Sequence, residues 1–202
     1  FWVDRGQSMQ FTSDKAHGAK ADRAALLALA LCVLLVRGGE RVGLTDTPLR
    51  PMTGEVQLGR LAEALTQERT ADYAPPDLTM LPRHARAVFI SDFMGAPEPV
   101  AEALATAAER GVTGVMIQIL DPAEEAFPFD GRTVFHSMGG TLEFETRKAA
   151  DLRSRYQARL AERKEALAQM AAHAGWQYHC HHSDTPPASA LLWAFAALEG
   201  HR

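Results

Sequence analysis

Cysteine is scarce in this chain, which has only two cysteines among its 202 residues. Cys32 lies inside a strongly apolar run, and Cys180 lies near the C-terminal end of the sequence. Small secreted domains are held together by several paired cysteines, so a disulfide framework of that kind is excluded. The cysteine usage predicts a reducing, cytoplasmic environment.

Long apolar runs are also missing. The most hydrophobic stretch, residues 24–36 ("AALLALALCVLLV"), has 13 residues, whereas a helix needs roughly 20 apolar residues to cross a bilayer. It is predicted to be a buried core helix, and we expect no membrane span within this chain. The chain begins without Met and inside an expected strand, so we expect missing upstream sequence, where a membrane anchor could lie unseen.

A basic excess is absent as well, because the net charge is -4 at pH 7. Binding along nucleic-acid phosphates needs a concentrated basic face. The basic residues of the expected helix 147–174 are interleaved with Asp151, Glu162 and Glu165, a pattern typical of a solvated face. We therefore predict no nucleic-acid partner, and the chain length fits a single domain over residues 1–202.

The order of the apolar segments indicates the fold class. Segments of strand length alternate with longer segments of helical period, which predicts a doubly wound α/β fold with a mostly parallel sheet and helices on both faces. The expected strands are residues 1–4, 41–46, 85–92, 114–121, 132–137 and 176–181. The expected helices are residues 19–37, 55–68, 97–110, 147–174 and 187–199.

Three of the expected strands finish on aspartate, at Asp4, Asp92 and Asp121. The carboxyl ends of parallel strands share one edge of a sheet, and open α/β folds bind ligands there. A cluster of carboxylates at that edge requires a metal ion or a cationic group. Asp121 opens the sequence Asp-Pro-Ala-Glu, which has the spacing of a helix capping box, so capping explains most of its role. Asp4 and Asp92 have no adjacent helix start to cap and are the stronger site candidates.

Several motifs in fixed order carry a resemblance to a known family. "FWVDRGQSM", a long helix that contains lysine, "RVGL" and "VFISDF" resemble a von Willebrand factor type A domain. More narrowly, the chain resembles the bacterial family called domain of unknown function 58. The segments "ILDPAEEAFPFDGRTVF", "LRSRYQARL" and "HSDTPPASALLWAFAAL" extend this resemblance over nearly the whole chain. The resemblance implies a von Willebrand factor A-like, Rossmann-like fold.

The resemblance also implies a metal-ion-dependent adhesion site (MIDAS). In that site a first loop of the form Asp-x-Ser-x-Ser, a threonine from a second loop and an aspartate at the end of a later strand surround a divalent cation. Asp4 and Ser8 match the first loop, and Asp92 matches the later aspartate. Gly6 stands where the first serine is expected, so one hydroxyl ligand is missing.

Thr70 is the expected threonine of this site, with Thr79 and Thr66 as alternatives. The expected ion is Mg2+, because this small, hard cation takes about six oxygen ligands and keeps several waters. Hydroxyl ligands hold the ion without cancelling its charge, which leaves it able to attract a carboxylate from a partner.

The resemblance implies a non-catalytic protein-binding domain. Its contact edge would consist of residues 4–8, the segment around Thr70, and Asp92. Related bacterial proteins are often associated with MoxR-type AAA ATPases, so such an ATPase is the expected partner, with this domain as an adaptor in complex maturation or metal insertion. The alternative is a metal-independent scaffold that makes its contacts through the helix from residue 147 or through upstream sequence.

Two other kinds of chemistry have weaker support in the sequence. A hydrolase has little support, because no glycine follows Ser8 as a nucleophile elbow requires, and no Gly-Lys-Ser/Thr phosphate loop is present. The segment "YHCHHSD" suggests zinc, but only alternate residues of a strand, such as His179 and His181, share a face. No second cysteine or HxxxH spacing completes a ligand set, so this segment is interpreted as polar residues at the end of an edge strand.

Overall fold

The structure is a computed structural model that describes residues 1–67, 72–136, 143–146 and 150–200. The strands of this part of the chain are β1 (Trp2–Val3), β2 (Arg86–Ser91), β3 (Thr113–Leu120), β4 (Thr133–His136), β5 (Glu143–Thr146) and β6 (Gln177–His182). Its helices are η1 (Gln7–Gln10, a 3-10 helix), α1 (Lys20–Arg37), α2 (Glu55–Leu65), α3 (Glu98–Glu109), α4 (Pro122–Ala126), α5 (Ala150–His173) and α6 (Pro187–Glu199).

Four strands form one parallel sheet in the order β1-β2-β3-β6. The central strands β2 and β3 are aligned from Arg86 opposite Thr113 to Ser91 opposite Gln118. Their near-continuous apolar sequences are typical of parallel strands covered on both faces. The prediction of a doubly wound α/β fold with a mostly parallel sheet is confirmed.

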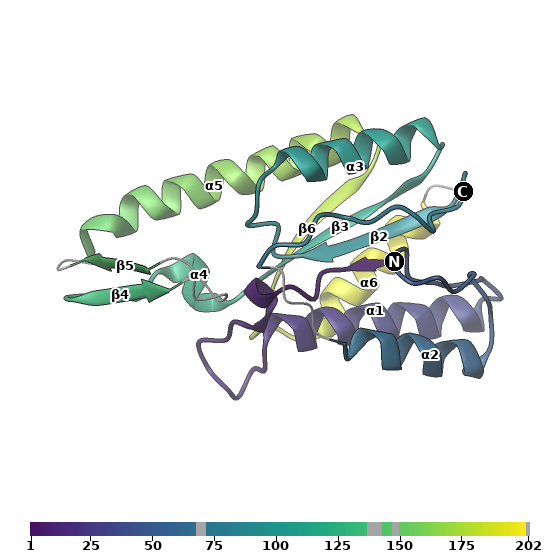
Figure 1. Cartoon of the computed structure of the whole chain (residues 1–202), viewed down its shortest axis with the longest axis horizontal. Helices are drawn as coiled ribbons and strands as arrows, with labels where there is room; N and C mark the ends of the chain where they lie inside the picture. The colour runs from purple at the N-terminus through teal and green to yellow at the C-terminus, as the bar shows by residue number, and fades with distance from the viewer. Residues whose placement is uncertain (68–71, 137–142, 147–149, 201–202) are drawn as a thin grey trace.

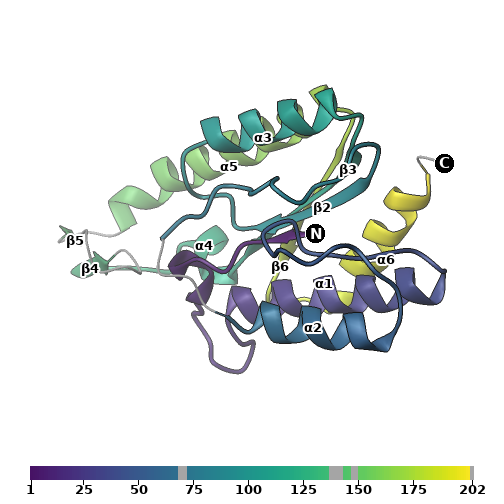
Figure 2. The same cartoon turned by 45° about the vertical axis from the view of Figure 1, so that its right-hand side comes forward.

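Helices cover both faces of this sheet (Figures 1 and 2). One face packs against α1, α2 and α6, and the other packs against α3 and α5. Successive residues of β2 serve the two cores alternately, since Val88 and Ile90 lie in the first core while Ala87 and Phe89 lie in the second. The alternation therefore determines which side chains of the strand face which helical layer.

The apolar run 24–36 lies within α1 and forms a core helix, as predicted. Its residues at helical spacing, such as Leu27 and Leu31, are fully buried, while Leu26 on another face is half exposed. The helix ends at the expected glycine pair, where Gly39 adopts a positive φ of 86° that disfavours a side chain. Among the described residues no helix has the length and apolar character needed to cross a membrane.

The strand predicted at residues 41–46 is wrong. Val42 makes one isolated bridge to Met52, and Gly43 and Thr45 exchange single hydrogen bonds with Phe1. Because β1 contains only two residues, it offers too few backbone groups for a ladder with this segment. The helix predicted at 55–68 is also shorter than expected and ends at Leu65.

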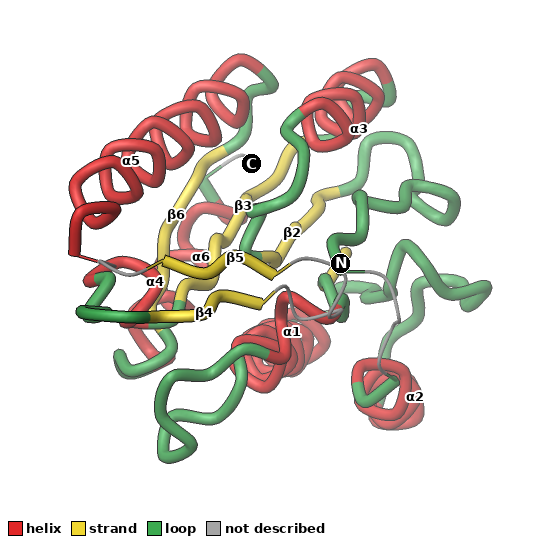
Figure 3. Tube along the Cα trace, turned by 60° about the vertical axis from the view of Figure 1, so that its left-hand side comes forward, coloured by secondary structure: helices red, strands yellow, loops and turns green. Residues whose placement is uncertain are grey.

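The strand predicted at 132–137 exists as β4, but it lies outside the main sheet. It pairs antiparallel with β5, with Thr133 opposite Thr146. The sequence reasoning missed β5, whose residues "EFET" are half acidic. Figure 1 shows this two-stranded ribbon beyond α4 and apart from the main sheet, and in the view of Figure 3 it lies in front of the sheet.

Helix α5 forms over the expected region, and its basic side chains are not all free in solvent. Arg153 donates from Nε to the Phe127 carbonyl at 3.0 Å, and Lys164 forms an ion pair with Glu125 at 2.7 Å. Basic side chains of α5 therefore hold the segment that contains α4 against α5. That segment directly borders the candidate site.

Candidate functional site

The three aspartates lie at the strand ends, as predicted. Asp4 follows β1, Asp92 follows β2 and Asp121 follows β3, and all three are buried. The strands are parallel, so the three carboxylates gather along one edge of the sheet, at the left of Figure 1. This edge is where an open α/β fold binds its ligands.

Asp121 has the capping role that its sequence context predicted. Its side chain accepts a hydrogen bond from the Ala123 amide at 2.8 Å, and Glu124 completes the capping box by accepting from the Asp121 amide at 2.8 Å. Asp121 also accepts from the backbone amide of Ser13 at 2.8 Å. These contacts hold the start of α4 and the Ser13 loop, so Asp121 contributes to the edge as a structural residue.

Asp4 is held in place by the loop that follows it. The Gly6 amide donates to Asp4 Oδ1 at 2.8 Å, and the Ser91 hydroxyl donates to Asp4 Oδ2 at 2.7 Å. Burial, with a smaller contribution from the nearby Asp92 carboxylate, raises the pKa of Asp4 to about 6 against the effect of these hydrogen bonds. The Asp4 carboxylate is therefore short of compensating positive charge.

Ser8 lies in η1 with its side chain buried. Its hydroxyl has no hydrogen-bond partner among the described residues, while its amide donates to the Asp72 carbonyl at 3.1 Å. Arg5 anchors the same loop. Its buried side chain forms an ion pair with Asp46 and donates a hydrogen bond to the Ala64 carbonyl. A buried, unpartnered hydroxyl is thus held in a fixed position beside the Asp4 loop.

Asp92 carries a feature that the sequence reasoning missed. The ammonium of Lys20, at the start of α1, donates to Asp92 Oδ2 at 2.9 Å and to Glu124 Oε1 at 2.6 Å. The Lys20 side chain is only 1% exposed. Burial alone would lower the pKa of Lys20, but the two carboxylates outweigh it and raise that pKa above its ordinary value. The carboxylate cluster required a metal or a cationic group, and Lys20 is such a group.

One signal in the sequence could have indicated the role of Lys20. It is the first residue of the helix that contains the apolar run 24–36, and the helix dipole disfavours a positive charge at that end. A lysine there needs a specific anionic partner. Glu124 was assigned only to the capping box, but its second oxygen faces Lys20.

The second loop of the expected metal site is less defined. Thr70 lies outside the described residues. Of the two alternatives, the Thr66 hydroxyl donates to the Glu63 carbonyl at 2.7 Å at the end of α2, and Thr79 is exposed. The structure therefore describes Asp4, Ser8 and Asp92 of the expected ligand set.

The chemistry of these three side chains fits a small, hard cation. Two carboxylates and an unpartnered hydroxyl provide oxygen donors of the kind that Mg2+ prefers. Gly6 contributes no hydroxyl, and its amide instead orients Asp4. Lys20 competes for Asp92, because its ammonium already uses one oxygen of that carboxylate.

The histidines considered for zinc, His179 and His181, make other contacts. The His179 ring stacks on Trp193 with 4.7 Å between the ring centroids. The His181 ring contacts the Thr185 hydroxyl at 3.2 Å, and burial lowers the pKa of His181 to about 4. The residues of β6 between and after them point to the opposite side of the strand.

A parallel sheet wound by helices on both faces, with acidic residues at its strand ends, defines a Rossmann-like fold of the von Willebrand factor A type. The family within this class follows from the sequence. The profile described as "Protein of unknown function DUF58" matches residues 1–166, and the chain belongs to this family. The expected single domain over residues 1–202 stays a prediction.

Two solved structures share the fold. One is described as an aerotolerance-related membrane protein from Bacteroides fragilis NCTC 9343 with multiple mutations to serines; it is 16% identical over 98% of this chain and 96% of that chain, with a TM-score of 0.57. The other is described as the conserved hypothetical protein BatB from Bacteroides thetaiotaomicron; it is 15% identical over 98% of this chain and 97% of that chain, with a TM-score of 0.58. At these identities the likeness concerns the fold alone. No curated protein matches the chain.

Proposed function

We propose that this chain is a non-catalytic protein-binding domain whose contact surface is the strand-end edge of the sheet. Mg2+ would be held there by Asp4, Ser8 and Asp92, with Thr70 from the second loop. The proposed partner is a MoxR-type AAA ATPase, for which the domain would act as an adaptor in complex maturation or metal insertion. This partner rests on the family resemblance.

The observation that carries the metal part is the buried hydroxyl of Ser8. It has no hydrogen-bond partner among the described residues, and an unsatisfied buried polar group costs about 1–3 kcal/mol. The raised pKa of Asp4 indicates that the neighbouring carboxylate also lacks positive charge. A bound cation would satisfy both groups at once.

Other residues around the site hold its ligands in position. The Gly6 amide and the Ser91 hydroxyl orient the Asp4 carboxylate. Arg5 fixes the loop to the end of α2. When bound, Mg2+ would supply an open coordination position that a carboxylate of a partner protein could fill.

Thermal unfolding with Mg2+ against a chelator tests the metal part. At tenfold Kd a ligand stabilises the native state by about 1.4 kcal/mol, which raises Tm by about 3–6 °C for a chain of this size. Ser8→Ala should lose most of this increment without lowering the metal-free Tm, because it deletes a buried hydroxyl that has no partner. Gly6→Ser should enlarge the increment, since Gly6 has an ordinary φ of -65° and a serine would restore the missing ligand.

The matched control is Ser189→Ala, which removes an exposed serine of α6 far along the chain. Its Mg2+ increment should equal that of the wild type. If neither the wild type nor Gly6→Ser responds to millimolar Mg2+, the metal part is wrong and only the fold assignment survives.

The buried Lys20 favours a second candidate, a metal-independent scaffold. Its ammonium already neutralises part of the carboxylate cluster, so the edge could be complete without a metal. Pull-down of a purified MoxR-type ATPase separates the two candidates. Recovery that falls with a chelator and in Ser8→Ala supports the metal-dependent domain, whereas recovery unchanged by both supports the scaffold.

A further inference from the structure

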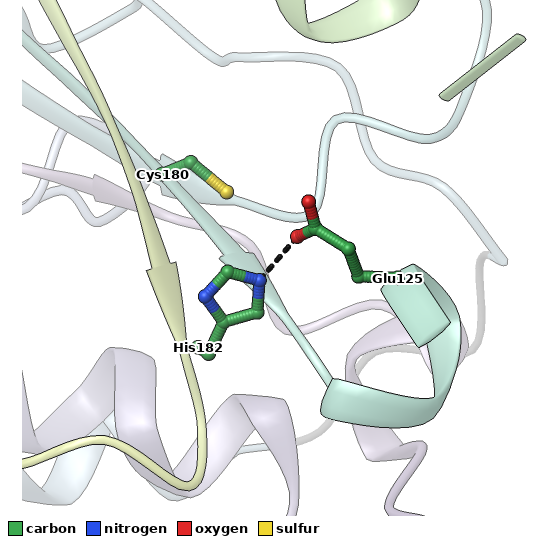
Figure 4. Close-up of side chains that lie close together, drawn as sticks. All are labelled: Glu125, Cys180 and His182. Atoms are coloured by element: carbon green, nitrogen blue, oxygen red, sulfur yellow. Dashed lines mark hydrogen bonds and ion pairs between the residues drawn. The ribbon is translucent and has the colours of Figure 1, made fainter. Parts of the chain in front are cut away.

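A second group of side chains lies beside this edge and does not belong to the site above. Glu125 of α4 faces Cys180 and His182, which are alternate residues of β6 and therefore share one side of the strand (Figure 4). One ligand atom from each residue lies within 4.8 Å of the other two. All three side chains are partly exposed, so an ion in solution could reach them.

We propose that Glu125, Cys180 and His182 form a binding site for a transition-metal ion of the Zn2+ type. Thiolate, imidazole and carboxylate are the donors that Zn2+ uses in proteins, whereas Mg2+ avoids sulfur. Three protein ligands leave the fourth tetrahedral position for water or for a ligand from another molecule. The site is thus chemically distinct from the oxygen site at Asp4 and Asp92.

The geometry needs only a small adjustment. Around a tetrahedral Zn2+ the ligand atoms lie about 3.3–3.7 Å apart, as follows from metal–ligand bonds of about 2.0–2.3 Å. His182 Nε2 already contacts Glu125 Oε2 directly, so these two groups would open slightly. Rotation of partly exposed side chains can supply this movement, while β6 and α4 keep their backbone positions.

Lys164 of α5 is the competing cation. Its ammonium forms an ion pair with Glu125 Oε1 at 2.7 Å. Burial raises the pKa of the Cys180 thiol, with Lys164 acting in the opposite direction, so the thiol is protonated at neutral pH without a metal. Binding would form the sulfur–metal bond and release that proton to solvent.

The adjacent residues Glu124 and Glu125 face different cations beside the two sites. Glu124 faces Lys20 of α1, and Glu125 faces Lys164 of α5. Substitutions at Cys180 or His182 should therefore leave the Mg2+ response unchanged. Failure of the zinc proposal would not touch the proposed function.

Titration of the whole chain with Co2+ tests the proposal, because a cobalt–thiolate bond gives a charge-transfer band in the near ultraviolet. The wild type should show this band, and added Zn2+ should remove it by displacement. Cys180→Ser should abolish the band. His182→Gln and Glu125→Gln should weaken binding by at least about tenfold, the loss already seen when only an outer-shell partner is removed. Lys164→Met should tighten binding, because it removes the competitor for Glu125.

Two control variants make the result specific. Cys32→Ala removes the other cysteine, which is buried in the core, and His179→Gln alters the histidine on the other side of β6. Both should keep the band and the affinity for Co2+. No band in the wild type, or a band that survives Cys180→Ser, would overturn the proposal. Apo unfolding curves for each variant verify that it folds.

Discussion

The buried ammonium of Lys20 allows the sharpest prediction from this structure. Lys20→Met keeps most of the side-chain volume but leaves the Asp92 and Glu124 carboxylates without their shared cation. Removing one partner of a buried ion pair costs about 3–5 kcal/mol, because the remaining charge stays desolvated. With a urea m-value of about 2 kcal/mol/M, this loss lowers the unfolding midpoint by roughly 1.5–2.5 M.

Urea unfolding followed by tryptophan fluorescence measures the effect, since Trp2 and Trp176 are buried in the native state. Burial raises the pKa of Glu124 and Lys20 opposes this effect, so the variant should take up a proton more readily as the pH falls. The gap to the wild type should therefore narrow towards acidic pH. Mg2+ should stabilise Lys20→Met more than the wild type, because the Asp92 oxygen used by the ammonium becomes available.

Lys15→Met is the matched control, because Lys15 is exposed in the loop before α1. It should leave the midpoint unchanged. A loss below about 1 kcal/mol for Lys20→Met, the range of surface ion pairs, would refute the view that this lysine neutralises a buried cluster.

Three further predictions concern stability. Asp4 has a raised pKa of about 6 against 3.8 unfolded, so its protonated form favours the native state. In metal-free buffer this stabilisation of about 3 kcal/mol is lost as the pH rises through 6. Asp4→Asn should lack this loss when urea unfolding is measured as a function of pH. Asp121→Ala removes the cap of α4 and should lower the free energy of unfolding by about 1–2 kcal/mol, measured by urea unfolding, while the exposed Asp130→Ala should not. Gly59→Ala, inside α2 with open space, should raise Tm by relieving a cost of about 1 kcal/mol. Gly114→Ala should lower Tm sharply, since the added Cβ would lie 2.1 Å from the Ala87 carbonyl oxygen. Equal shifts in Tm for the two glycine variants would contradict the close pairing of β2 with β3.

The main sheet could be predicted because its central strands β2 and β3 are apolar on both faces and longer segments of helical period lie between the strands. Residues 187–199 were predicted as a helix and form α6 with those bounds. The segment 41–46 misled the prediction because its composition suits a strand while its pairing depends on the length of β1. Strand β5 could not be found, because its partner β4 is distant from the sheet and its polar sequence has no apolar alternation.

The edge carrying Asp4, Asp92 and Asp121 was predictable from strand ends and parallel topology. The positions of Lys20 and of the Glu125 cluster were not, because both depend on how α4 sits between two helical layers. The spacing in "YHCHHSD" limits any shared ion to alternate residues, and this inference stays a prediction. Which alternate pair faces a third ligand is decided by the fold and by the place of Glu125 beside β6.

The hydrogen bonds between Phe1 and the segment at Gly43 and Thr45 have a consequence for solubility. An outer strand with free amide and carbonyl groups is a template for pairing with another molecule, and natural sheets protect such margins. Here the Phe1 amino group donates to the Gly43 carbonyl at 2.7 Å, and the Thr45 amide donates to the Phe1 carbonyl at 2.8 Å. The irregular segment thus shields the β1 margin from intermolecular strand addition, although it adds no strand of its own.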